Sequence, residues 1–167
     1  MFQKYLTKPG GRFYVLYVDF QKAFDSLVHY NLFRSLINKG IKGNFIKVLI
    51  VMYSKLQARV KNGSNTFSNS FCCNIGTGQG DLSSPIIFSL YINDLCKFIR
   101  ENCRNGIFIT QDVPDIFCLM YADDIANCAD TAVNLQSQLN CIEGFCKETG
   151  MCVNLKKTEI IVFRKLC

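Results

Sequence analysis

The sequence predicts an α+β fold in which helices pack on one face of an antiparallel sheet. Residues 13–18 form an apolar run rich in aromatic and β-branched residues, typical of a buried strand. The later segments alternate irregularly between helical spacing and paired strand-like runs, in the order β, α, α, β-hairpin, α, β-hairpin, α, β-hairpin. This mixed order, without an internal repeat or an evident linker, favours one α+β domain.

Composition narrows the class of protein. The 167 residues are enough for one domain with a sizeable core, and 49% hydrophobic against 19% charged residues indicates a globular chain. No secretory signal is visible and no apolar run reaches about 18 residues, so we expect an intracellular protein, nuclear or cytoplasmic, without a membrane partner. The net charge of +6 is compatible with a polyanionic partner but does not require one.

Ten cysteines are present, yet no C-x-x-C pair occurs and His29 is the only histidine. Zinc-site spacing is therefore missing, and no structural zinc is expected. Without a secretory route, the thiols are predicted to be reduced and mostly buried.

The elements of the first half follow from local patterns. The strand at 13–18 stops at Asp19, which places a carboxylate at its C-terminal end. Helical spacing after Asp25 ends at Lys39-Gly40, and a second helix is predicted over about 44–55, with Phe45, Val48, Leu49 and Met52 on one face. The runs 57–61 and 66–73 are predicted to be two strands around a turn at Asn62-Gly63.

The second half begins with a glycine-rich loop at 76–81, and Ser84-Pro85 then starts a helix that ends near Arg100. Residues 101–115 are expected to be a loop with a short strand at 107–109. A strand hairpin turns at 121–124, and a helix that starts near Ala132 ends at Gly150. A last hairpin is predicted to join 151–155 to 160–164 through 156–158.

The hairpin at 121–124 carries the strongest chemical signal. Asp123 and Asp124 interrupt an apolar run, where unpaired charge is costly and neighbouring carboxylates repel each other. A divalent cation relieves both effects, and carboxylate oxygens suit magnesium. If the first strand lies beside this hairpin, Asp19 joins the pair, and three acids at one sheet edge indicate a metal site for phosphoryl transfer. A solvated acidic hairpin without a ligand is the alternative.

Five short motifs occur in a fixed order along nearly the whole chain. They are 18–25 (VDFQKAFD), 78–85 (GQGDLSSP), 91–95 (YINDL), 121–124 (YADD) and 153–158 (VNLKKT). Together they resemble the reverse transcriptase, the RNA-directed DNA polymerase, of non-LTR (LINE-type) retrotransposons.

The resemblance implies a right-hand polymerase palm that transfers a nucleotide from a dNTP to the 3′-hydroxyl of a DNA primer on an RNA template. Asp19 and Asp123 would be the main ligands of two Mg²⁺ ions, with Mn²⁺ as a possible substitute. Asp124 would assist, and the carbonyl of Phe20 would add an oxygen ligand.

Other matched residues would contact substrate. Phe24 corresponds to an aromatic gate against the 2′-hydroxyl, although without the motif a core position would be the favoured interpretation. Gln79 and Gly80 match a loop that lies against the nascent base pair, where a plain glycine turn is the alternative. Lys157 would act near the leaving pyrophosphate. The alternatives are that the adjacent Lys156 takes this role or that both lysines are simply solvated. Tyr121 is expected to pack beneath the hairpin.

Two departures from the family pattern stand out. Gly78 occupies the position where the family usually has arginine. The earlier fingers motifs and the thumb are missing, so residues 1–167 are predicted to be a single palm-centred fragment of a larger polyprotein. A truncated, inactive remnant and a non-enzymatic nucleic-acid-binding domain are the alternatives to an active polymerase.

Overall fold

The computed structural model describes residues 11–63, 66–78, 80–103, 106–107 and 116–164. They form two compact units: a sheet unit, with residues up to Gln21 and from Ile92 onward, and a helical unit, Lys22–Tyr91. The elements in chain order are β1 (Arg12–Val18), α2 (His29–Asn38), α3 (Asn44–Ser54), β2 (Gln57–Ala58), β3 (Phe71–Cys72), α4 (Ser84–Asn102), β4 (Cys118–Tyr121), β5 (Asp124–Ala129), α5 (Ala132–Thr149) and β6 (Glu159–Arg164).

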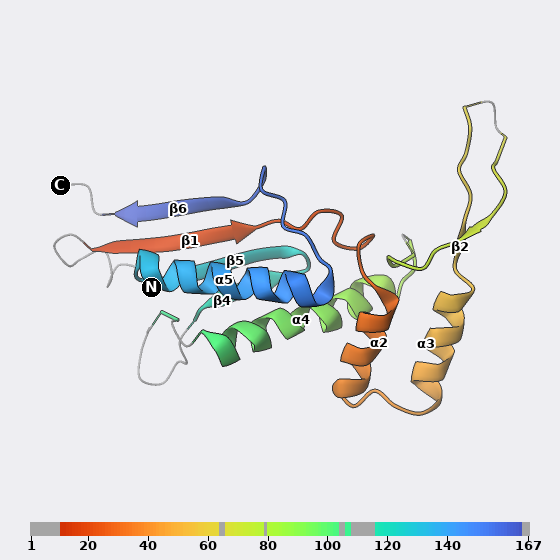
Figure 1. The fold of residues 1–167 in the computed structure, drawn as a ribbon, viewed down its shortest axis with the longest axis horizontal. Coiled ribbons are helices and arrows are strands. Elements are labelled where there is room, and N and C mark those ends of the chain that lie inside the picture. Colours follow the sequence, from red (N-terminus) through yellow and green to blue (C-terminus); the bar gives the residue numbers. More distant parts are fainter. Residues whose placement is uncertain (1–10, 64–65, 79, 104–105, 108–115, 165–167) are drawn as a thin grey trace. The chain divides into compact units, whose positions relative to one another are not determined.

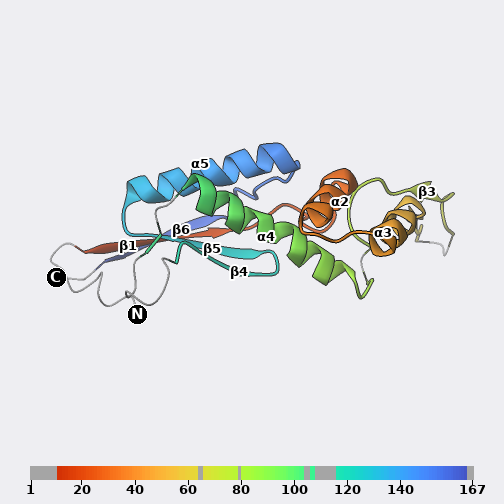
Figure 2. The same cartoon turned by 90° about the horizontal axis from the view of Figure 1, so that it is seen from below.

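The sheet unit is built on four strands in the order β4-β5-β1-β6, all antiparallel to their neighbours. Helix α5 lies along one face of this sheet and packs against β5 and β1 (Figures 1 and 2). Leu16 and Val18 of β1 are buried on that face; on the opposite face Phe13 and Val15 are buried as well, whereas Tyr17 is 45% exposed. The predicted antiparallel sheet with helical cover on one face is therefore confirmed.

Helix α5 begins and ends as its sequence predicts. The hydroxyl of Thr131 accepts a hydrogen bond from the backbone N–H of Asn134, which satisfies one free donor of the first turn. Gly150 closes the helix in the left-handed conformation, with φ of 77°, and its N–H donates to the carbonyl of Cys146.

The predicted last hairpin is wrong. β6 pairs with β1, with Leu16 opposite Ile160, and not with residues 151–155. That stretch contacts the chain just after β1, where Val153 and Phe20 form an antiparallel bridge. Strand-like patterning shows that a segment is extended but does not specify its partner, and β1 offered a free edge.

The helical unit contains α2 and α3, which pack together, and a short hairpin. β2 and β3 pair as predicted, although each has only two residues. The buried residues of α3 are Ile46, Leu49 and Tyr53, so the predicted face was only partly right. Helix α3 is apolar on nearly every side, so hydrophobic spacing did not single out its inner face. Of the predicted strand at 107–109, Ile107 forms a bridge with Ile116, and 108–109 lie outside the described residues.

A disulfide joins Cys103 at the end of α4 to Cys141 in α5. The expectation of reduced thiols is therefore wrong for this pair, which folding brings together across 38 residues. The remaining described cysteines are free thiols, and because only Cys128 among them is buried, the expectation of mostly buried thiols is also wrong. In the part of the chain that the structure describes, no helix combines the length and apolar character needed to cross a bilayer.

Candidate functional site

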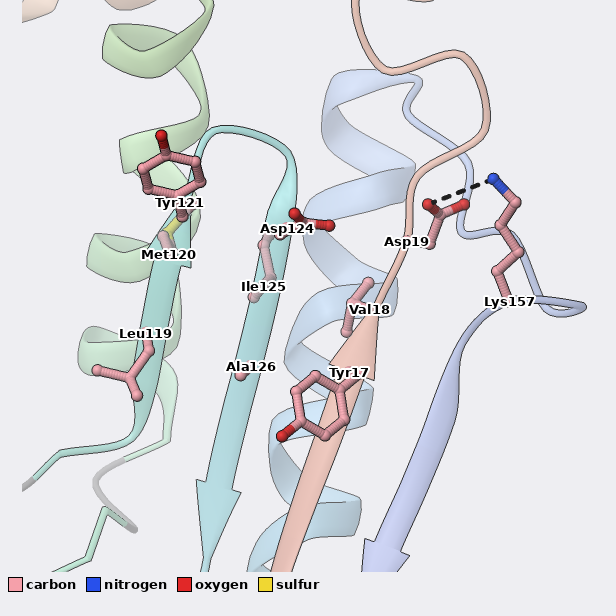
Figure 3. A pocket seen from close by; sticks show the side chains of 10 residues that line it. All are labelled: Tyr17, Val18, Asp19, Leu119, Met120, Tyr121, Asp124, Ile125, Ala126 and Lys157. Carbon is pink, nitrogen blue, oxygen red and sulfur yellow. Dashed lines mark ion pairs between the residues drawn. The ribbon is translucent and has the colours of Figure 1, made fainter.

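The two predicted acidic segments meet at one end of the sheet. Val18, the last residue of β1, lies opposite Ile125 of β5, and Asp19 and Asp124 occupy the next position on each strand. Because opposite residues of an antiparallel pair project to the same side, the two carboxylates lie on one face. This is the face opposite α5. Figure 3 shows both carboxylates at the same end of the two strands.

Asp123 occupies the two-residue turn between β4 and β5, because Tyr121 pairs directly with Asp124. Ala122, the first turn residue, has φ of 54°, a left-handed conformation that is uncommon for a residue with a side chain. Such strain persists only where the surrounding structure enforces it. The Tyr121 side chain is 83% exposed, so the expectation that it packs beneath the hairpin is wrong.

A groove of about 590 Å³ opens at this sheet end, and its lining includes Asp19, Asp124 and Lys157 (Figure 3). Tyr17 and Tyr121 add aromatic walls. The turn residue Asp123 does not belong to the lining. Among the residues that the structure describes, no three His, Cys, Asp or Glu side chains gather into a ready-made metal cluster. The groove thus presents two carboxylates, and the third acid, Asp123, directly precedes Asp124 in the sequence.

Asp19 is held by a segment far along the chain. Its carboxylate Oδ2 accepts a hydrogen bond from the amide of Asn154 at 2.8 Å. Its backbone N–H donates to the hydroxyl of Thr158 at 3.2 Å, and its carbonyl accepts from the N–H of Asn154 at 2.8 Å. Asn154 and Thr158 belong to the motif at 153–158, but no role could be predicted for them from the sequence. Only the contact with Asp19 reveals it.

Phe20 is buried and forms its bridge with Val153. The hydrogen bonds on either side of this bridge are made by the Asp19 carbonyl and the Gln21 N–H. In an antiparallel pair of this kind, the backbone groups of the central residue face away from the partner. The carbonyl of Phe20 is therefore directed away from Val153.

Lys157 is the cation of the groove, with its ammonium nitrogen 3.9 Å from Oδ1 of Asp19. Its side chain is 69% exposed, so this ion pair is loose and contributes little to stability. An exposed ammonium in a groove with two carboxylates is available to meet an incoming anion.

The remaining predicted residues belong to the helical unit. The N–H of Thr77 donates to the carbonyl of Phe24 at 2.9 Å, and the N–H of Gly76 donates to that of Leu27 at 2.7 Å. These bonds fasten the glycine-rich loop to the segment that carries Phe24. The Phe24 ring is half-buried and packs on Phe88, with ring centroids 4.3 Å apart.

The end of the glycine-rich loop leads into α4. Gly80 is exposed, with φ of 91°, while Gln79 lies outside the described residues. The N–H and hydroxyl of Ser83 both donate to the Asp81 carboxylate, and they hold the pKa of that carboxyl below its usual range. Gly78 has an ordinary backbone conformation, so its position does not demand glycine.

Beneath the hairpin, α4 and β4 bring sulfur atoms together. The Cys96 sulfur lies 2.9 Å from that of Met120, which lines the groove. A hydrogen bond from the Cys118 thiol, with help from Arg100, lowers the pKa of Cys96 to about 7. The same contact raises the pKa of Cys118. No pattern in the sequence predicted this pair.

Comparison with known proteins places this geometry in a family. Residues 2–165 match the family described as reverse transcriptase (RNA-dependent DNA polymerase). The chain belongs to this family. The resemblance to non-LTR retrotransposon proteins is also confirmed. The chain is 27% identical, over 148 residues, to a Pol polyprotein from the type-1 retrotransposable element R2 of Popillia japonica, and 29% identical over 146 residues to that of the type-2 element R2DM of Drosophila melanogaster.

These matches cover 88% and 86% of this chain but only 20% and 13% of the two relatives. Among solved structures, the apo telomerase of Candida tropicalis, truncated from its C-terminal domain, is similar with a TM-score of 0.73 and 19% sequence identity. That match covers 97% of this chain and 32% of the telomerase chain. The shared fold confirms the polymerase palm.

Proposed function

We propose that this chain is the palm of an RNA-directed DNA polymerase of a non-LTR retrotransposon, which transfers a nucleotide from a dNTP to a DNA primer on an RNA template. The observation that carries the proposal is the pairing of β1 with β5, which presents Asp19 and Asp124 on one face of a groove. The groove is open, and Asp19, Asp124 and Lys157 are the charged residues of a lining that is otherwise mostly apolar.

The donor atoms at the groove fit magnesium. Asp19 and Asp124 supply hard carboxylate oxygens, and neither is fully buried. Asp19, Asp123 and Asp124, with the carbonyl of Phe20, would hold two Mg²⁺ ions, for which Mn²⁺ can substitute. When bound, the ions would neutralise charge that develops on the attacking oxygen and on the phosphates.

The other residues act on the nucleic acid and nucleotide. Lys157 donates a proton to, or neutralises, the leaving pyrophosphate. Phe24 excludes the 2′-hydroxyl of a ribonucleotide by its ring, and Gln79 with Gly80 contacts the nascent base pair and template. Gly78, without the arginine usual in the family, leaves one such contact unmade. In this proposal, residues 1–167 form one partial palm domain.

Primer extension on an RNA template tests the proposal. We expect the chain to extend a DNA primer with dNTPs and Mg²⁺, and Asp19→Ala or Asp123→Asn to reduce extension to background. Asp130→Asn is the matched control, because Asp130 pairs with Asn134 and does not line the groove. Wild-type chain that binds RNA but never extends a primer would overturn the proposal in favour of an inactive remnant or a binding domain.

A further inference from the structure

Asp19 is bracketed by a single turn. Its N–H, its carbonyl and one carboxylate oxygen are all bonded to Asn154 or Thr158. The turn lies more than 130 residues further along the chain. A carboxylate at the end of a strand would otherwise rotate freely, so this bracket determines which way it faces.

The two oxygens of the Asp19 carboxylate have different partners. Oδ2 accepts from the amide Nδ2 of Asn154 at 2.8 Å, whereas Oδ1 lies 3.9 Å from the ammonium of Lys157. The amide thus engages Oδ2 and leaves Oδ1 on the side of the groove that carries Lys157. Carboxylates that bind metals are themselves commonly oriented by such hydrogen bonds.

The amide of Asn154 is itself fixed. Its Oδ1 accepts a hydrogen bond from the N–H of Lys156 at 3.2 Å, and its backbone carbonyl accepts from the N–H groups of Lys157 and Thr158. A backbone N–H only donates and a carboxylate only accepts. The contact of the side-chain amide with the N–H of Lys156 and its contact with the carboxylate of Asp19 therefore require the same orientation of the amide. Asn154 therefore turns its donor group toward Asp19.

We infer that Asn154 is a positioning residue, which orients the Asp19 carboxylate so that Oδ1 is offered to a divalent cation. The inference rests on the proposed function, because it assumes that Asp19 binds the cation. It goes beyond that function because a neutral amide, which is not itself a proposed ligand, would determine how tightly the carboxylates bind the cation. Thr158 supports the same geometry through the backbone of Asp19.

The test measures Mn²⁺ binding by the 167-residue chain in the absence of nucleic acid. Binding is detected in electron paramagnetic resonance, where the signal of free Mn²⁺ decreases as the ion is bound. We expect Asn154→Ala and the shape-matched Asn154→Leu to weaken Mn²⁺ binding about 10- to 100-fold, as loss of such hydrogen bonds does. Asn134→Ala is the matched control, since its amide donates to Asp130 at 2.7 Å away from the groove. It should bind Mn²⁺ like the wild type.

Lys157→Met tests whether an effect on Mn²⁺ binding comes from the orientation of the Asp19 carboxylate or from the neighbouring ammonium group. Loss of a positive charge at the groove strengthens Mn²⁺ binding, so this variant should change affinity in the opposite direction to Asn154→Ala. Thermal unfolding of each variant, measured without metal, shows whether the fold is retained. Two Asn154 variants are used so that a misfolded one does not decide the result.

The outcomes are distinguishable. Wild-type affinity in a folded Asn154 variant, while Asp19→Ala abolishes binding, would overturn the inference and leave the proposed function standing. Mn²⁺ binding that survives Asp19→Ala unchanged would overturn the proposed metal site itself. Weakened binding in folded Asn154 variants but not in Asn134→Ala supports the inference.

Discussion

Two half-buried cysteines, Cys96 and Cys146, differ strongly in pKa because their surroundings differ. The hydrogen bond from Cys118 lowers the pKa of Cys96 to about 7, whereas burial and the nearby Cys152 raise the pKa of Cys146 to about 11. Since the thiolate is the nucleophile, the two residues should differ in reactivity at neutral pH.

We therefore predict that iodoacetamide modifies Cys96 with a midpoint near pH 7 and Cys146 only in strongly alkaline solution. Mass spectrometry of the labelled peptides over a pH series measures both. Cys118→Ala removes the largest cause of the shift and should move the Cys96 midpoint upward. A common midpoint for Cys96 and Cys146 would contradict the prediction.

Phe24 carries a second prediction at this scale. If its ring excludes the 2′-hydroxyl, Phe24→Ala should raise ribonucleotide incorporation relative to deoxynucleotide incorporation severalfold in primer extension. Phe33→Ala is the control, because Phe33 is also half-buried in the helical unit and packs on Tyr53. Unchanged rejection of ribonucleotides in Phe24→Ala would favour a purely structural role, consistent with its packing on Phe88.

At the scale of elements, the glycine-rich loop depends on close backbone contact. Gly76 has φ of 84°, and a Cβ there would lie 2.9 Å from the carbonyl oxygen of Asp25. The loop can therefore fasten to the segment carrying Phe24 only if this residue has no side chain.

Alanine substitutions at Gly40 and Gly76 distinguish the cost of a left-handed backbone conformation from the cost of a steric clash. Gly40→Ala, with φ of 89° and open space around the new methyl group, should lower the free energy of unfolding by about 1–2 kcal/mol. Gly76→Ala should lower it by more, because the methyl group also meets backbone that cannot move aside cheaply. Urea unfolding measures both, and equal losses would show that the close contact is unimportant.

For the whole molecule, cation binding at the proposed metal site should raise the free energy of unfolding. Two carboxylates share the groove, and a cation that binds only the folded chain stabilises it by mass action, by about 2.7 kcal/mol at 100 times its dissociation constant. Mg²⁺ should therefore raise the melting temperature, and EDTA should reverse the rise. Asp19→Ala should melt at the same temperature with and without Mg²⁺; an undiminished rise in this variant would place the cation elsewhere.

Much of this architecture was readable from local sequence. Residues 13–18 predicted a strand that ends at Asp19, and residues 121–124 predicted a hairpin turn, because an apolar run and its interruption by acidic residues are visible over a few residues. Gly150 marked the end of α5 for the same reason. The five motifs indicated the reverse transcriptase family and its palm fold, and both are confirmed. The roles of the individual site residues remain predictions.

The tertiary structure alone decided what pairs with what. It placed β6 beside β1, joined Cys103 to Cys141, and bracketed Asp19 with Asn154. These contacts link segments that are 38 to more than 130 residues apart, and their free energy depends on the packing of the completed fold. Periodicity reports which face of a segment is apolar, but it carries no information about which distant segment will cover it.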